Sequence, residues 1–195
     1  MQFSHIISDG LLAATGLFVF FRYLSKLNFW ETLLWESFVL SVAIAAAFGL
    51  LGYSGITDFG WIGVFFQNLA TIVGVLGLVV GAWHLVNNKT VNQQNAIFTM
   101  ALGFVLLISK LALKIAPISM VTSIGGIGVI LLIAIYGIFN GNKKASIWLL
   151  VAVIFAALAN FKDQFIVDAS LAVDVYHYLL AASLLCFGVA VSQKK

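Results

Sequence analysis

The sequence predicts an all-α polytopic integral membrane protein, a seven-transmembrane-helix bundle that forms a single domain over residues 1–195. Hydrophobic residues make up 63% of the chain and charged residues only 9%, whereas about a quarter of the positions in soluble domains are charged. The mean hydropathy is +1.11. Seven apolar runs, most of them near the roughly 20 residues that a spanning helix needs, leave only short connections.

The first three runs end at clusters of turn-forming residues. The first, residues 6–24, follows a terminus without the basic segment and cleavage motif of a signal peptide, so we expect it to remain as a helix. The second, residues 29–51, starts after Leu27-Asn28 and ends at the glycine-containing segment 52–55. The third, residues 61–86, ends at the polar segment 87–90. These boundaries predict three helices joined by short turns.

The last four runs are bounded in the same way. The fourth, residues 96–115, and the fifth, residues 118–139, meet at Pro117, which fits the first turn of a helix because its missing N–H is not needed there. They are therefore predicted to form a tight antiparallel hairpin. The sixth, residues 146–160, is the shortest and lies between polar segments 140–144 and 161–164, and the seventh covers residues 167–192.

Small residues recur at helical spacing in three of the runs. In membranes such residues let helix backbones approach closely, so we expect tight helix packing there. The positions are Ser37, Ser41, Ala45 and Gly49, then Gly77 and Gly81, then Gly137 and Gly141.

The basic residues are distributed unequally between the two sides of the predicted bundle. An odd number of spans places the termini on opposite sides, and lysine and arginine are enriched in cytoplasmic loops. We therefore predict a multi-pass protein, of a bacterial cytoplasmic membrane, with its amino terminus outside and its carboxyl terminus inside. The inner side holds Arg22, Lys26, Lys89, Lys143, Lys144, Lys194 and Lys195, and the outer side holds Lys110, Lys114 and Lys162.

Ionisable residues at membrane depth are costly and are the first place to look for function. In the seventh run Asp174 and His177 lie three residues apart on one helical face, where we expect them to pair. His5 and Asp9 make a similar stripe in the first run, and Gln67 lies near the start of the third. These five side chains predict a polar outer-leaflet pocket for a small ligand, an ion or a proton. The alternative is that they only cap or pair helices.

A second cluster is predicted on the inner side, where Glu36 and His84 are placed to pair across the second and third runs. The alternative is that these are interfacial residues beside Trp35 in an aromatic belt. Lys110 and Lys114, near the outer end of the fourth run, are expected to extend their ammonium groups to the membrane surface.

Three segments carry a family resemblance: SDGLL at residues 8–12, GLLGYSG at residues 49–55 and DVYHYLL at residues 174–180. Together they resemble a family of bacterial seven-helix membrane proteins without an assigned activity. That family is itself similar to the CREST superfamily of alkaline ceramidases, hemolysin III proteins and progestin/adiponectin receptors. The resemblance implies a seven-helix fold. In the hydrolases of the superfamily it also implies a zinc ion held by three histidines, with a nearby Ser and Asp assisting attack on a lipid amide.

The sequence departs from this pattern at the expected zinc ligands. Val173 stands where the first histidine of an HxxxH pair would precede His177, and the second run ends in Tyr53-Ser54 without a histidine. Beside His177, a zinc site would have to recruit Asp9, Asp174 and His5, and such a set of oxygen and nitrogen ligands is less selective for zinc.

Three functions follow from these observations. The leading one is an integral membrane protein whose pocket binds a small ligand or ion, with membrane lipids as its surroundings. The alternatives are a CREST-like metal-dependent lipid amidase or esterase with zinc as cofactor, and a structural subunit of a membrane complex. The composition excludes nucleic-acid binding, and the single Cys186 excludes an internal disulfide and a thiolate metal cluster.

Overall fold

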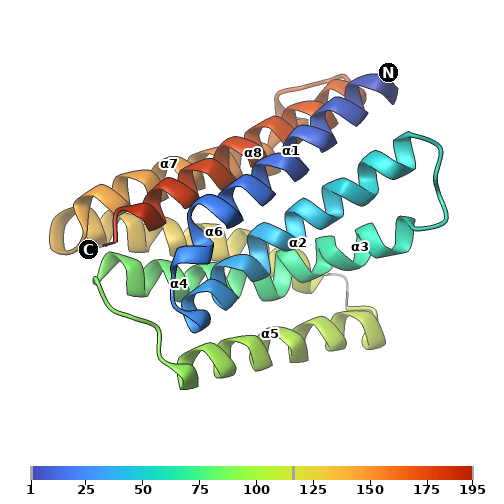
Figure 1. The fold of residues 1–195 in the computed structure, drawn as a ribbon. Helices are drawn as coiled ribbons and strands as arrows, with labels where there is room; N and C mark the ends of the chain where they lie inside the picture. Colours follow the sequence, from blue (N-terminus) through green and yellow to red (C-terminus); the bar gives the residue numbers. More distant parts are fainter. Residues whose placement is uncertain (1, 116, 195) are drawn as a thin grey trace.

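The computed structural model describes residues 2–115 and 117–194. Within these residues there is no strand, and seven helical spans are long and apolar enough to cross a membrane (Figure 1). The predicted seven-helix bundle is therefore confirmed, and the chain is a multi-pass membrane protein. The helices are α1 (Gln2–Arg22), α2 (Phe29–Tyr53), α3 (Gly60–Leu69), α4 (Val75–Val86), α5 (Gln93–Leu113), α6 (Pro117–Asn140), α7 (Lys143–Asn160) and α8 (Ala169–Ser192), of which α3 and α4 share one span. Lys195, used above for the orientation, lies outside the described residues.

Side-chain caps determine where several helices begin. Asn142 accepts a hydrogen bond from the backbone N–H of Ala145 at 3.2 Å, so α7 starts at Lys143 rather than at residue 146 and reaches 18 residues. Asp168 caps α8 in the same way, so that helix starts at Ala169 rather than at residue 167. The start of α7 moves because polar Lys143 and Lys144 belong to the helix, and the start of α8 moves because the Asp168 side chain caps it.

The third span contains a feature that the sequence did not predict. A π-helical turn, Ala70–Gly74, joins α3 to α4 without interrupting the span. Such turns are rare and occur frequently at functional sites. Here the turn places Ala70 and Thr71 on the wall of the central cavity described below.

Close helix packing occurs at the small residues that predicted it. A Cβ atom added to Gly77 of α4 would lie 2.4 Å from the carbonyl oxygen of Leu34 in α2. One added to Gly137 of α6 would lie 2.4 Å from Cγ1 of Val86. A larger residue would clash with the backbone of α2 at Gly77 and with the Val86 side chain at Gly137, so these glycines allow the neighbouring helices to pack closely.

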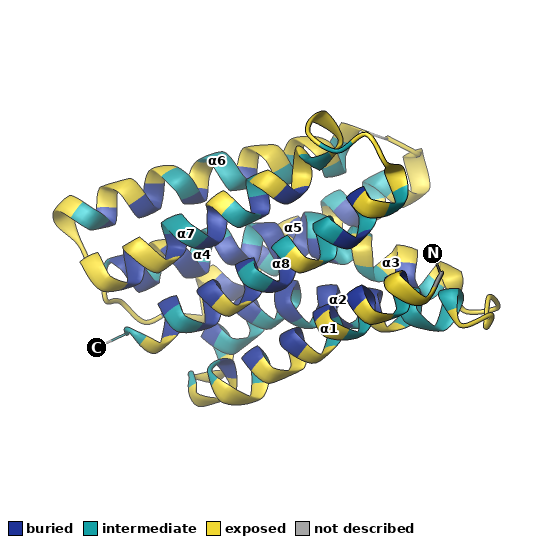
Figure 2. Cartoon of the chain, turned by 90° about the horizontal axis from the view of Figure 1, so that it is seen from above, coloured by how far each residue is buried: buried dark blue, intermediate teal, exposed yellow. Residues whose placement is uncertain are grey.

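One hydrophobic core runs between α1, α2, α4, α6, α7 and α8, while α5 packs on the outside against α4 and the π-helical turn. Figure 2 shows buried residues on the inward faces of the helices and exposed ones on the outward faces. Helices α1, α3, α6 and α8 begin at the same end of the bundle (Figure 1). We call it the amino end, and the functional residues gather there.

Candidate ligand-binding site

Seven polar side chains meet at the amino end where α1 lies against α8. On α8 they are spaced three or four residues apart, and on α1 two adjacent pairs are four residues apart, which places each set on one face. We call this set the α1–α8 polar cluster. It consists of Ser4, His5, Ser8 and Asp9 from α1 and of Ser170, Asp174 and His177 from α8.

Asp174 is the most highly connected member of the cluster. Its carboxylate is 6% exposed and accepts hydrogen bonds from Ser4, from His5 Nδ1 at 2.8 Å and from Ser8 Oγ at 2.7 Å. Because a carboxylate only accepts, a neutral His5 carries its proton on Nδ1, and its Nε2 then accepts from Ser170 Oγ at 3.1 Å. Three donors on α1 thus hold one buried carboxylate of α8.

Asp9 and His177 form the second pair in the cluster. His177 Nδ1 lies 3.2 Å from Asp9 Oδ1 and 3.1 Å from Ser8 Oγ. Because Ser8 already donates to Asp174, it accepts from His177, so the proton of a neutral His177 lies on Nδ1. No hydrogen bond to His177 Nε2 occurs within residues 2–115 and 117–194. This atom is therefore an open acceptor.

These contacts correct the expected pairing of Asp174 with His177. Both side chains point from α8 towards α1, and each finds its partner there: His5 for Asp174, and Asp9 for His177. Ser8 lies between the two pairs and contacts both. The pairing therefore crosses between helices instead of following the spacing along one helix.

Residues of α2 close the cluster from the side. Asp9 is 2% exposed, and a Cβ atom on Gly49 would lie only 2.6 Å from its Oδ2. Tyr53 packs its ring on that of His5 with centroids 4.7 Å apart. The resemblance segment at residues 49–55 thus supplies the wall against which His5 and Asp9 are held.

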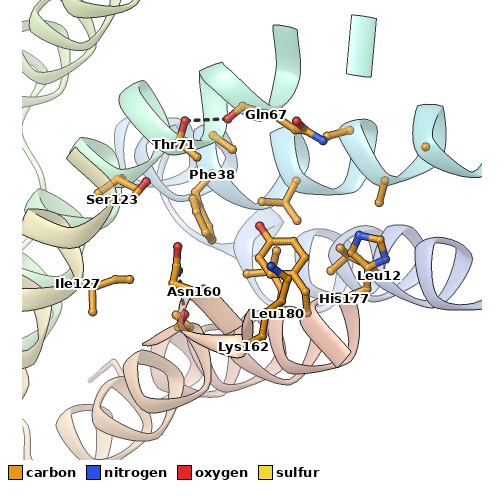
Figure 3. Close-up of a pocket in the computed structure, with 18 of the residues that line it drawn as sticks. Leu12, Phe38, Gln67, Thr71, Ser123, Ile127, Asn160, Lys162, His177 and Leu180 are labelled. Atoms are coloured by element: carbon orange, nitrogen blue, oxygen red, sulfur yellow. Dashed lines mark hydrogen bonds between the residues drawn. The ribbon is translucent and has the colours of Figure 1, made fainter. Parts of the chain in front are cut away.

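A cavity of about 490 Å³ extends from this cluster into the middle of the bundle (Figure 3). Its polar lining lies mainly towards the amino end of the bundle, and its inner part is apolar. In Figure 3, Gln67 and Thr71 lie on the wall opposite Asn160 and Lys162. The polar part includes Asp9, Tyr53, Gln67, Thr71, Ser123, Asn160, Lys162 and His177, and the apolar part includes Phe38, Leu78, Ile130 and Phe187.

The structure brings four of the five predicted pocket residues into direct contact in two pairs, His5 with Asp174 and His177 with Asp9. Gln67 lines the same cavity, although its side chain makes no hydrogen bond with them among the described residues. Asn160, the last residue of the sixth predicted run, and Lys162, in the segment after it, also line the cavity, although the sequence pattern marked neither as a site residue. The pattern also gave no partner role to Ser4 and Ser8, although both lie on the α1 face that carries His5 and Asp9.

The predicted inner pair of Glu36 and His84 is not formed. His84 donates from Nδ1 to the carbonyl oxygen of Val80 at 2.9 Å, and no ion pair or hydrogen bond joins it to Glu36 in the part of the chain that the structure describes. The buried acid at the end of the bundle opposite the amino end is Glu31, which pairs with Lys194, two residues after the end of α8. Glu31 precedes Glu36 in α2 and lies where the carboxyl-terminal segment passes.

The donor set does not fit the zinc ion that the CREST resemblance implies. Among the described residues, no group of three His, Cys, Asp or Glu side chains is arranged to hold a metal ion. Each carboxylate is instead engaged by a different imidazole, Asp174 by His5 and Asp9 by His177. No chemistry through a metal is derived for this site.

Comparisons with protein-family models, curated proteins and solved structures find no match to this chain. Its function is therefore inferred from the geometry of the cavity and the polar cluster.

Proposed function

We propose that this protein binds a small amphipathic molecule with a neutral hydroxyl-bearing head and a single hydrocarbon chain. The head lies beside Asp9 and His177, and the chain extends into the apolar part of the cavity. The observation that carries the proposal is the cavity itself. Its volume of about 490 Å³ lies within the range of roughly 300–1,000 Å³ typical of ligand pockets.

The hydrogen-bonding pattern supports the choice of head group. His177 Nε2 is an unpaired acceptor on a residue that lines the cavity, so it can accept a hydrogen bond from a ligand hydroxyl. The neighbouring Asp9 carboxylate disfavours an anionic head at this point because like charges repel. The Lys/Arg distribution supports an outer-leaflet position for this end of the bundle, with the carboxyl terminus in the cytoplasm.

The proposal is tested by native mass spectrometry of the detergent-purified protein with two probes, monoolein and methyl oleate. Both carry an oleoyl chain, but only monoolein has hydroxyl donors. We expect monoolein to bind about threefold to tenfold more tightly, the worth of one neutral hydrogen bond. The preference should disappear in His177→Leu. Equal binding of the two probes to the parent would contradict the proposed head-group contact.

A cavity-filling variant tests where the chain lies. Ala46 lines the cavity and is buried, so Ala46→Phe is expected to abolish monoolein binding. Ala101, which is exposed on α5, gives the matched control Ala101→Phe, which should bind as the parent does. Unchanged binding by a folded Ala46→Phe protein would refute the cavity as the site, and the structural-subunit alternative would then be preferred.

Ester hydrolysis is a second candidate, favoured by one observation. Ser170 Oγ, His5 Nε2 and His5 Nδ1, and Asp174 Oδ1 follow one another at 3.1 and 2.8 Å, the order of a nucleophile, a base and an orienting carboxylate. In this reaction Ser170 Oγ bonds to the ester carbonyl carbon and its proton passes to His5 Nε2. The leaving alkoxide then takes that proton, and water hydrolyses the acyl-serine.

This candidate ranks second because the nearest backbone donors are engaged. The N–H groups of Ser170 and Leu171 both donate to Asp168 Oδ1, so neither is free to stabilise an oxyanion. A fluorophosphonate probe is the test. Labelling that is lost in Ser170→Ala and kept in Ser192→Ala, an exposed serine at the other end of α8, would support hydrolysis. Absence of labelling in the parent would contradict it.

A further inference from the structure

A second hollow lies beside the central cavity at the amino end. Its volume is about 610 Å³, and it is lined by residues of α3, the π-helical turn, α5, α6 and the segment after α7. It shares Gln67, Thr71, Ser123 and Asn160 with the central cavity, so the two lie next to each other. We call it the Lys110 groove after its one lining lysine.

Lys110, in the last turn of α5, contacts two neighbouring helices. Its ammonium donates to Asn68 Oδ1 of α3 and, at 2.8 Å, to Ser119 Oγ of α6. Three helices therefore converge on this group. An ammonium has three N–H donors, and these contacts use two of them, which leaves one for a ligand.

The charge of Lys110 has no carboxylate partner. No Asp or Glu oxygen lies within 4.0 Å of its nitrogen among the residues described. Asp163 also lines the groove, but it is 73% exposed at the side chain and pairs with Lys162 at 3.0 Å. An unpaired ammonium that is half-buried within a spanning helix is costly, and an anionic ligand offsets this cost.

We propose that the Lys110 groove binds a phosphate group. Lys110 supplies the charge, and the groove offers further donors from Ser123 and from the side-chain amides of Gln67 and Gln164. This site goes beyond the proposed function, because its lining includes neither Asp9 nor His177 and it takes an anionic group, whereas the first site takes a neutral one. A phospholipid head group and free phosphate offer the same chemistry to it.

The test is native mass spectrometry of the purified protein with dioleoylphosphatidylglycerol and with dioleoylglycerol, which has the same chains and no phosphate. We expect the parent to bind the phosphatidylglycerol at least tenfold more tightly. Lys110→Gln should lose this preference and Lys110→Arg should keep it. Lys114→Gln is the matched control, because Lys114 follows one turn later and is exposed.

A competition with inorganic phosphate distinguishes the two sources. Displacement of phosphatidylglycerol by millimolar phosphate assigns the site to the free anion, whereas resistance to displacement assigns it to the lipid. If Lys110→Gln does not fold, Ser123→Leu fills the groove and is expected to lose the same binding. Equal binding of the two lipids by the parent, or parent-like phosphatidylglycerol binding by a folded Lys110→Gln or Ser123→Leu protein, would overturn the proposal.

Discussion

Replacing Asp174 by leucine tests whether the α1–α8 polar cluster holds the bundle together. The substitution removes three hydrogen bonds from α1 donors, Ser4, His5 and Ser8. Hydrogen bonds between membrane helices contribute about 0.6–1.7 kcal/mol each, so three of them predict a loss of about 2–5 kcal/mol. This agrees with the roughly 3–5 kcal/mol found when one partner of a buried pair is removed.

The assay is unfolding of the detergent-solubilised protein by a denaturing detergent, followed by loss of helical circular dichroism. Asp163→Leu is the matched control, since Asp163 is an exposed carboxylate at the same end whose ion pair contributes less than about 1 kcal/mol. The double variant Asp174→Leu with His5→Leu should recover part of the lost stability, because no imidazole is left without its acceptor. A loss below about 1 kcal/mol for Asp174→Leu, or equal to that of the control, would refute the reasoning.

Three further predictions concern packing, the opposite end of the bundle and orientation. Gly49→Ala should destabilise by about 1–3 kcal/mol in the same assay, because its Cβ meets Asp9 at 2.6 Å; Gly52→Ala, with no atom within 4 Å, should not, and equal effects would contradict the contact. Glu31→Gln should cost about 1–3 kcal/mol through its buried ion pair, while a loss as small as that of Glu36→Gln would argue against it. Green fluorescent protein fused to the carboxyl terminus should fluoresce and alkaline phosphatase fused there should be inactive, and the reverse result would invert the topology.

Two residues of the segments that carry the family resemblance contact the α1–α8 polar cluster. Gly49 and Tyr53 lie in the second resemblance segment, and their role became clear only from their contacts with Asp9 and His5. From the sequence, a glycine at this position suggested only close helix packing. The structure adds that the space it leaves is filled by a carboxylate of α1.

The seven helices can be predicted from the amino-acid sequence alone, because a bilayer of fixed thickness sets the length and hydropathy that each spanning run needs. The sequence also identifies His5, Asp9, Asp174 and His177 as site candidates, because ionisable groups are costly to bury in a membrane and are usually kept for function. Spacing along one helix shows which residues share a face, but it does not show which neighbour that face meets.

The hydrogen-bond partners of these side chains cannot be predicted without the tertiary structure. His5 and Asp174 are separated by 169 residues, and their contact depends on the rotation and height of α1 against α8. The same holds for Lys110, whose partners Asn68 and Ser119 come from two other helices. Helix rotation and height are set by the packing of the whole bundle at positions such as Gly77 and Gly137, so no single stretch of sequence encodes them.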